Sequence, residues 1–206
     1  MRKTLLTLFF PLLVVVQAQQ TIDSPINIIL LIGDGMGLSQ ISAGMYVNNN
    51  QTVLEDFSII GLSKTHATNS LVTDSAASGT AMACGEKTYN GVLGINSKNK
   101  KLQSILEICE ENGYNTGLIA NSSIVHATPA SFYANIDSRN KYEEIALQLT
   151  ESNVDYFIGG GKKYFNKRED NRNLIKEMDK IDVVKNFNAY KKSGSERIGF
   201  FTFNDE

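Results

Sequence analysis

The sequence has few of the residues that form cross-links or large aromatic anchors. Its 206 residues include no tryptophan, three prolines, two histidines and two cysteines. Two cysteines exclude a disulfide-rich scaffold, and the spacing of the cysteines and histidines excludes a Cys/His zinc cluster. Cys84 and Cys109 each lie in an apolar stretch. We therefore expect two buried free thiols, with one disulfide in an oxidising compartment as the alternative.

An excess of charge of one sign is also lacking. The chain has 20 Lys and Arg against 22 Asp and Glu, a net charge of −2, and the two signs are intermixed along it. Nucleic-acid-binding domains usually concentrate basic residues in a patch or tail. The composition therefore predicts no nucleic-acid partner.

Only the first residues contain a long apolar run. Arg2 and Lys3 precede Leu5–Val16, and these 12 residues are too few to span a bilayer. A basic start, a short apolar run and Ala18 at a cleavage position predict a signal peptide over residues 1–18, with an uncleaved anchor as the alternative. We therefore expect an exported protein, periplasmic or secreted, with no membrane span after the signal is removed.

Strand and helix patterns alternate along the remaining chain, which predicts an α/β fold with a mainly parallel sheet flanked by helices. We expect strands over Asn27–Ile32, Ser58–Ser63, Thr116–Ala120, Tyr156–Ile158 and Phe200–Phe203. We expect helices over Leu38–Val47, Ala76–Gly85, Leu102–Asn112, Pro129–Asn135 and Tyr142–Thr150, and a tight turn at Asn90-Gly91. Residues 19–206 form one domain in this interpretation, with about 162–194 as a peripheral, polar, helical insertion.

Asp34 is the first residue with a chemical hypothesis. It lies in Gly33-Asp34-Gly35-Met36-Gly37, directly after a predicted buried strand. Functional sites of open α/β sheets lie at the carboxyl ends of strands, and a carboxylate there can bind a cation. A plain β-turn is the alternative, because Asp-Gly pairs are common in turns.

Ser75 is the second residue with a chemical hypothesis. It lies in Thr73-Asp74-Ser75-Ala76-Ala77-Ser78-Gly79-Thr80, at the predicted start of a helix. Unpaired amides and the helix dipole would attract a phosphate there, although a serine needs a base or a metal to become a nucleophile. Ordinary helix capping by Asp74 or Ser75 is the alternative, and the local pattern alone favours it.

The third group is His126, Thr128 and Arg139. His126 and Thr128 would project to the same side of an extended segment and could bind a cation together. Arg139 could bind a phosphate through two parallel hydrogen bonds. A loop histidine, a capping threonine and a surface arginine are the alternatives.

These three groups occur in segments that resemble successive signature blocks of the alkaline phosphatase family: Asn27–Gly37, Thr73–Gly94 and Ser123–Arg139. The middle block, TDSAASGTAMACGEKTYNGVLG, is the most specific. The resemblance implies hydrolysis of small phosphate monoesters through a phosphoserine at Ser75, with Zn²⁺ and Mg²⁺ as cofactors. It also implies that Arg139 binds the phosphate and Asp74 supports Arg139. The implied metal ligands are Asp34, Ser75, Thr128 and His126, the last acting directly or through a neighbouring group.

The chain departs from this family in length and in histidine content. Family members are longer and take several metal ligands, mostly His and Asp, from their C-terminal half, whereas this chain has only His66 and His126. We therefore expect the N-terminal part of a longer protein, with an incomplete fold and little or no activity alone; a homodimer is compatible with the full-length form. The alternatives are a noncatalytic exported protein that binds phosphate or metal, and a phosphodiesterase or sulfatase of the same superfamily.

Overall fold

The computed structural model describes residues 27–205 of the chain. The predicted signal peptide, residues 1–18, lies outside the described residues. The chain divides into two units, Met1–Gly33 and Asp34–Glu206. All helices and strands of the described chain belong to the second unit.

A parallel sheet of four strands is the centre of the second unit. Its strands are β1 (Gly117–Ser123), β2 (Tyr156–Gly160), β3 (Asp182–Val184) and β4 (Ile198–Phe201), in the spatial order β1-β2-β4-β3. All three pairings are parallel, with Gly117 opposite Tyr156 and Tyr156 opposite Ile198. The α/β class with a parallel sheet is therefore confirmed.

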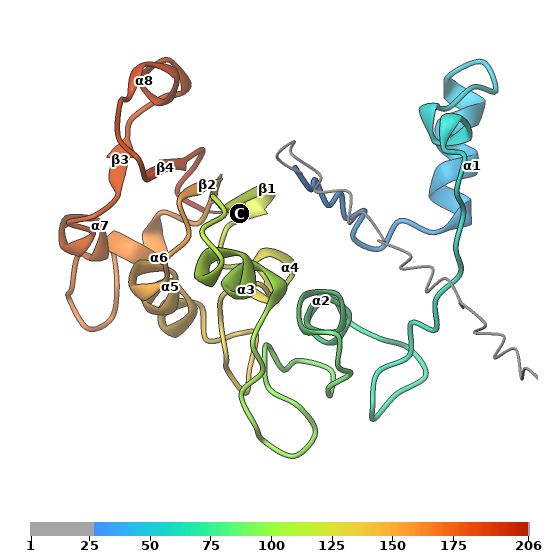
Figure 1. Cartoon of the computed structure of the whole chain (residues 1–206), viewed down its shortest axis with the longest axis horizontal. Coiled ribbons are helices and arrows are strands. Elements are labelled where there is room, and N and C mark those ends of the chain that lie inside the picture. The colour runs from blue at the N-terminus through green and yellow to red at the C-terminus, as the bar shows by residue number, and fades with distance from the viewer. Residues whose placement is uncertain (1–26, 206) are drawn as a thin grey trace, which may run out of the picture. The chain divides into compact units, whose positions relative to one another are not determined.

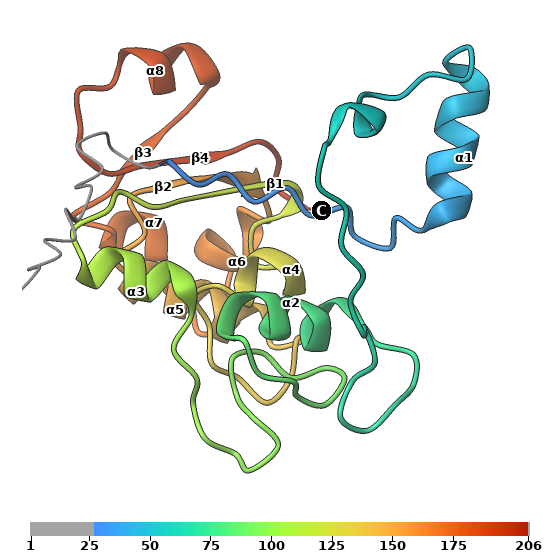
Figure 2. The same cartoon turned by 45° about the vertical axis from the view of Figure 1, so that its right-hand side comes forward.

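Most helices cover one face of this sheet, and α8 lies on the other (Figures 1 and 2). The longer helices are α1 (Leu38–Val47), α2 (Ser75–Cys84), α3 (Ile105–Glu111), α5 (Tyr142–Glu151) and α8 (Phe187–Lys192). Single turns form α4 (Ala127–Ala130), α6 (Lys163–Asn166), α7 (Leu174–Glu177) and the 3₁₀ helix η1 (Val53–Asp56).

Local sequence signals explain where several helices begin and end. Asp74 caps the start of α2, and Gly85 ends it at a φ of 70°. Ser104 and Glu107 form a reciprocal capping box at the start of α3. The predicted helices over 38–47, 76–85 and 142–150 are confirmed to within one residue at each end. The helix predicted from Pro129 instead begins at Ala127, because proline is tolerated in the first turn of a helix.

The core lies between the sheet and the helices beneath it. Phe157 of β2 and Phe165 of α6 are fully buried, and the ring of Phe201 in β4 packs against both, at centroid distances of 5.2 and 4.8 Å. Helix α5 contributes its apolar side through Ile145 and Leu149, which are also fully buried. This packing fixes the sheet against the helices that cover it.

Two predicted strands are wrong. Ile28 and Leu31 are 80% and 84% exposed, and Leu62 is completely exposed. Neither Asn27–Ile32 nor Ser58–Ser63 forms a strand in the part of the chain that the structure describes. An aliphatic run predicts burial. A strand also needs hydrogen bonds to a neighbouring backbone, and the apolar pattern does not show which part of the chain provides that backbone.

The segment 162–194 is more than a helical insertion. It contains α6, α7 and α8 as expected, but also β3, which pairs with β4 at the edge of the sheet. Phe165 and Leu174 anchor the segment in the core. The sequence pattern does not show β3, because three residues are too few to show a strand period.

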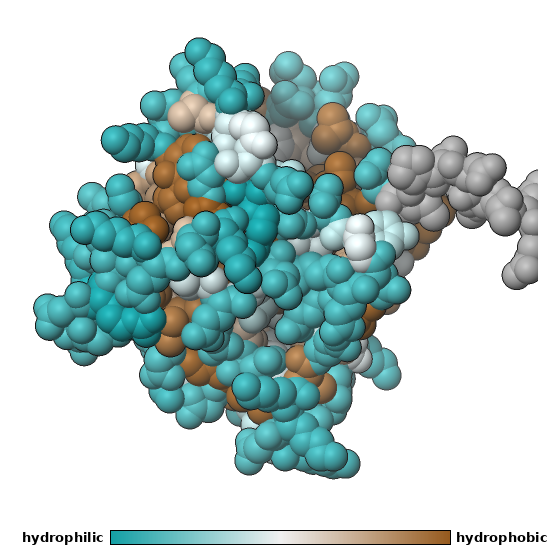
Figure 3. All heavy atoms as spheres, turned by 60° about the vertical axis from the view of Figure 1, so that its left-hand side comes forward, coloured by the Kyte–Doolittle hydropathy of each residue, from teal (hydrophilic) through white to brown (hydrophobic). Residues whose placement is uncertain are grey.

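The surface carries apolar side chains at several places on the face seen in Figure 3. Within residues 27–205, no helix combines the length and hydropathy that crossing a bilayer requires. Cys84 and Cys109 are free, as expected, although both are half-buried rather than buried. Burial, with the nearby charges of Glu107 and Glu86, raises the pKa of the Cys84 thiol to about 11.

Candidate active site

The amino-terminal end of α2 holds the central group of the predicted site. Asp74 occupies the position before the helix, and its Oδ1 accepts a hydrogen bond from the Ala77 amide at 2.9 Å. Ser75 is the first helical residue, so its own amide lies among the unpaired amides of the first turn. The capping interpretation is therefore correct for Asp74, and it leaves the second carboxylate oxygen free for other partners.

Arg139 contacts both residues of this pair. Its Nη1 donates to Asp74 Oδ2 at 3.2 Å and to Ser75 Oγ at 3.3 Å. The side chains of Arg139 and Asp74 are only 21% and 27% exposed. The fold thus joins residues that are 64 and 65 positions apart in the chain, and it places a guanidinium and a hydroxyl side by side at a helix amino terminus. Such a group can bind a phosphate dianion.

The Asn90-Gly91 turn completes the surroundings of the pair. Gly91 has the positive φ, 85°, expected for glycine in a tight turn. Its amide donates to Asp74 Oδ2 at 2.9 Å, and its carbonyl accepts from the Arg139 amide at 2.7 Å. The sequence pattern of this dipeptide predicted only a turn. Asn90-Gly91 lies inside Thr73–Gly94, the most specific signature block, and this position was the sequence signal that the turn belongs to the site.

Asp34 and Thr128 form a second pair. Thr128 Oγ1, from α4, donates to Asp34 Oδ2 at 2.9 Å. Helix α4 follows the carboxyl end of β1 and packs against α2. The close contact of the two helices depends on Gly79, where an added Cβ would overlap the side chain of Ser131. The structure therefore brings Asp34 and Thr128 into contact, and their assignment as metal ligands by the family resemblance stays a prediction.

His126 precedes α4 and is half-buried. Its amide donates to the Ser123 carbonyl at 3.0 Å and its carbonyl accepts from the Ala130 amide at 3.0 Å. No hydrogen bond of its imidazole is recorded within residues 27–205. Its assignment as a metal ligand therefore stays a prediction.

The donor set decides which metals these residues fit. Zinc in proteins takes three or four ligands from Cys, His, Asp and Glu, and residues 27–205 contain no group of three such side chains that could hold an ion. The described residues therefore do not fit a zinc site by themselves. Asp34 and Thr128 offer a carboxylate and a hydroxyl oxygen, which fit part of the shell of Mg²⁺, an ion that keeps several waters.

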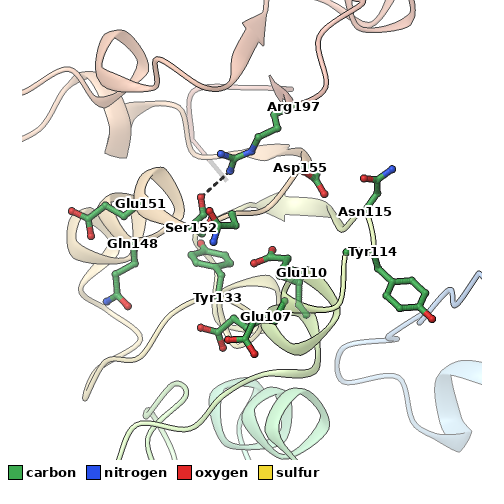
Figure 4. Close-up of a pocket in the computed structure, with 14 residues that line it drawn as sticks. Glu107, Glu110, Tyr114, Asn115, Tyr133, Gln148, Glu151, Ser152, Asp155 and Arg197 are labelled. Atoms are coloured by element: carbon green, nitrogen blue, oxygen red, sulfur yellow. Dashed lines mark hydrogen bonds between the residues drawn. The ribbon is translucent and has the colours of Figure 1, made fainter.

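A hollow of about 610 Å³ lies elsewhere in the fold. Carboxylates of α3 and of the start of β2 surround it, and Arg197 donates to the Ser152 carbonyl at 2.8 Å at its rim (Figure 4). Its lining residues precede β1, β2 and β4, whereas His126 follows the carboxyl end of β1. None of the six predicted site residues lines it. This hollow therefore lies at the opposite edge of the sheet from His126 and is not the predicted site.

Sequence comparisons give the same family for most of the chain. The alkaline phosphatase family profile matches residues 26–202. Alkaline phosphatase 4 of Bacillus subtilis is 38% identical over 189 residues, which cover 84% of this chain and 41% of that protein. The repressible alkaline phosphatase of Saccharomyces cerevisiae is 35% identical over 214 residues, covering 87% of this chain and 38% of that protein. The chain thus spans about two fifths of the length of these relatives.

Solved structures show the same relationship in three dimensions. The alkaline phosphatase of the Antarctic bacterium TAB5 superimposes with a TM-score of 0.79 at 39% identity, covering 84% of this chain and 52% of that one. The Thermus thermophilus alkaline phosphatase superimposes with a TM-score of 0.70 at 31% identity, covering 80% of this chain and 36% of that one. Together with the family profile that matches residues 26–202, these similarities show that the chain belongs to the alkaline phosphatase family.

Proposed function

We propose that the protein represented by this chain hydrolyses phosphate monoesters through a phosphoserine at Ser75. The observation that carries the proposal is the contact of Arg139 Nη1 with both Asp74 Oδ2 and Ser75 Oγ at the start of α2. The function of the relatives named above supports it.

In this proposal the guanidinium of Arg139 binds two oxygens of the substrate phosphate, and Asp74 orients that guanidinium. The Ser75 and Ala76 amides, at the start of α2, stabilise the negative charge. Ser75 Oγ attacks phosphorus, forming the serine O–P bond while the bond to the ester oxygen breaks and the alcohol leaves with a proton. Water then cleaves the phosphoserine, which releases inorganic phosphate and restores the serine hydroxyl.

Divalent cations are part of the proposal as cofactors. A variant of the TAB5 enzyme has been solved with Mg bound. We propose Mg²⁺ at Asp34 and Thr128, with His126 beside it, and Zn²⁺ at a site that takes Asp34 and Ser75 together with ligands outside the described residues. When bound, these cations would favour the alkoxide form of Ser75 and stabilise the charge of the phosphate.

We further propose that the 206-residue chain alone hydrolyses esters weakly, because its two histidines leave too few zinc ligands. The lack of a three-residue metal cluster within residues 27–205 also favours a second candidate, an exported protein that binds phosphate without turnover. Small monoesters as substrates, export through residues 1–18 and a homodimeric full-length protein remain proposals.

The test is an assay of the full chain with a phosphate monoester and a phosphate diester in parallel, in the presence of Zn²⁺ and Mg²⁺. We expect slow release of p-nitrophenol from p-nitrophenyl phosphate that disappears in Ser75→Ala, and no faster reaction with the diester. Phosphate binding without any turnover would favour the noncatalytic candidate. Turnover that survives Ser75→Ala would contradict the proposed nucleophile.

A further inference from the structure

The side chain of Asn90 binds the segment that leads into Ser75. Its Oδ1 accepts from the Asp74 amide at 3.0 Å, and its Nδ2 donates to the Val72 carbonyl at 2.9 Å. Its own amide donates to Asn69 Oδ1 at 3.1 Å. One side chain therefore binds the segment that leads into Ser75 at two points, on either side of Thr73.

The next residue binds the other side of the site. The Gly91 amide reaches the Asp74 carboxylate, and the Gly91 carbonyl accepts from the Arg139 amide at 2.7 Å. The dipeptide Asn90-Gly91 thus binds the backbone amide and the carboxylate of Asp74, and it binds the backbone amide of Arg139. A shift of this turn would move the Asp74 carboxylate relative to the guanidinium that it orients.

The chemistry of the two contacts of the Asn90 side chain selects an amide. One contact needs an acceptor for the Asp74 N–H, and the other needs a donor for the Val72 C=O. Aspartate offers no donor at neutral pH and adds a charge next to Asp74, and an alanine offers neither group. Asparagine has both groups on a short side chain.

From these contacts we propose that Asn90 is a positioning residue that sets the phosphate affinity of the site. It acts by holding the backbone of Asp74, so that Asp74 Oδ2 stays on Arg139 and Arg139 stays on Ser75. The expected change in phosphate affinity rests on the proposed function, whereas the expected change in how firmly the Arg139 side chain is held does not.

The test compares Asn90→Ala with a matched control in the full chain. Asn96 is a suitable control, because its side chain, like that of Asn90, makes two hydrogen bonds to the backbone: its Oδ1 accepts from the amides of Lys98 and Lys100. No contact of Asn96 with Asp74, Ser75 or Arg139 is recorded within residues 27–205. Melting temperatures of the two variants show whether both have lost similar stability.

The first readout is the dissociation constant of inorganic phosphate, measured by calorimetry. We expect Asn90→Ala to weaken binding about tenfold, and Asn96→Ala to leave it within about twofold of the unchanged chain. In a chain that already carries Arg139→Ala, adding Asn90→Ala is expected to have no further effect, because residues of one network are not additive. Full additivity of the two changes, or unchanged affinity in Asn90→Ala, would overturn the proposal.

The second readout needs no phosphate. Proton NMR of the Arg139 guanidinium, assigned with Arg139→Lys, reports whether the side chain is held. We expect slowly exchanging Nη protons in the unchanged chain and in Asn96→Ala, and fast exchange in Asn90→Ala. A chain that binds no phosphate but shows this pattern would refute the proposed function and keep the positioning role. Slow exchange in Asn90→Ala would refute the positioning role.

Discussion

At the scale of single residues, the Asp74 carboxylate divides its two oxygens between two tasks. Oδ1 caps helix α2 through the Ala77 amide, and Oδ2 accepts from Gly91 and Arg139. Capping the helix and contacting Arg139 are therefore not alternatives here. The same side chain that starts the helix also orients the arginine beside Ser75.

Replacing Asp74 with asparagine separates these tasks. One amide oxygen can still cap the Ala77 amide, but the amide nitrogen cannot accept from Arg139. We expect phosphate affinity to fall about tenfold, equivalent to about 1.4 kcal/mol, while the free energy of unfolding falls by about 1 kcal/mol or less. Calorimetric titration with phosphate and urea unfolding measure the two effects. A large loss of stability with unchanged phosphate affinity would contradict this division.

Cys84 gives a second prediction at this scale. Because burial raises its pKa to about 11, little thiolate exists at pH 8, and the thiolate is the reactive form. In a Cys109→Ser chain, iodoacetamide is expected to alkylate Cys84 slowly at pH 8 and faster as the pH approaches 11. Urea should restore the rate of an ordinary thiol. Rapid alkylation of the folded chain at pH 8 would show that Cys84 is not shielded as described.

At the scale of elements, the close packing of α2 on α4 places Thr128 near the helix that begins at Ser75. Gly79 permits this packing, since a side chain there would overlap Ser131. The geometry of the site therefore depends on a residue that makes no contact with phosphate in the proposed function.

Gly79→Ala is expected to destabilise the protein by about 1–3 kcal/mol, the usual effect of overpacking. The matched control is Gly44→Ala in α1, where an added Cβ meets nothing within 4 Å; alanine there should leave stability unchanged or raise it by up to about 1 kcal/mol. Thermal unfolding of both variants measures the difference. Equal melting temperatures would show that the α2–α4 contact is looser than described.

Helix α3 contributes a pH-dependent element through Glu110. Burial raises the pKa of Glu110 above its ordinary value of 4.5, and the charges of Asp155 and Glu107 add to the rise, while hydrogen bonding by Thr116 and the charge of Arg197 oppose it. The folded state therefore binds this proton more tightly than the unfolded state. It follows that Glu110 lowers stability as the pH rises from about 4.5 through its folded pKa.

Glu110→Gln should remove this loss, because the amide oxygen can still accept from Thr116 Oγ1 and carries no charge. We expect the melting temperatures of the variant and the unchanged chain to be similar near pH 4 and to diverge above pH 5, with the variant more stable. A constant difference at all pH values would show that Glu110 does not titrate as described.

At the scale of the whole molecule, local signals predicted the helices well and the sheet only in part. The cap of α2 at Asp74 and the apolar side of α5 lie in or next to the helices themselves, so the local sequence contains what is needed to place them. A strand depends on a partner elsewhere in the chain. For this reason Asn27–Ile32 was wrongly predicted as a strand, and the three residues of β3 were missed.

In the candidate site, too, local sequence signals predicted the adjacent residues but not the contacts between distant segments. Adjacent residues marked Asp74 and Ser75 only as the start of a helix, and their contact with Arg139 joins segments more than 60 residues apart. Only the family resemblance, and not periodicity or spacing, predicted that contact. Asn90 was assigned to a turn, because nothing in a turn pattern shows that its amide reaches Asp74.

The central claim is that Ser75 is the residue that accepts a phosphoryl group. Incubating the full chain with radiolabelled inorganic phosphate at low pH, where a phosphoserine would persist, and mapping the label by peptide mass spectrometry tests it directly. The account predicts covalent phosphate on the peptide containing Ser75, retained in Ser78→Ala and lost in Ser75→Ala. Label on another residue, or label that persists in Ser75→Ala, would contradict it.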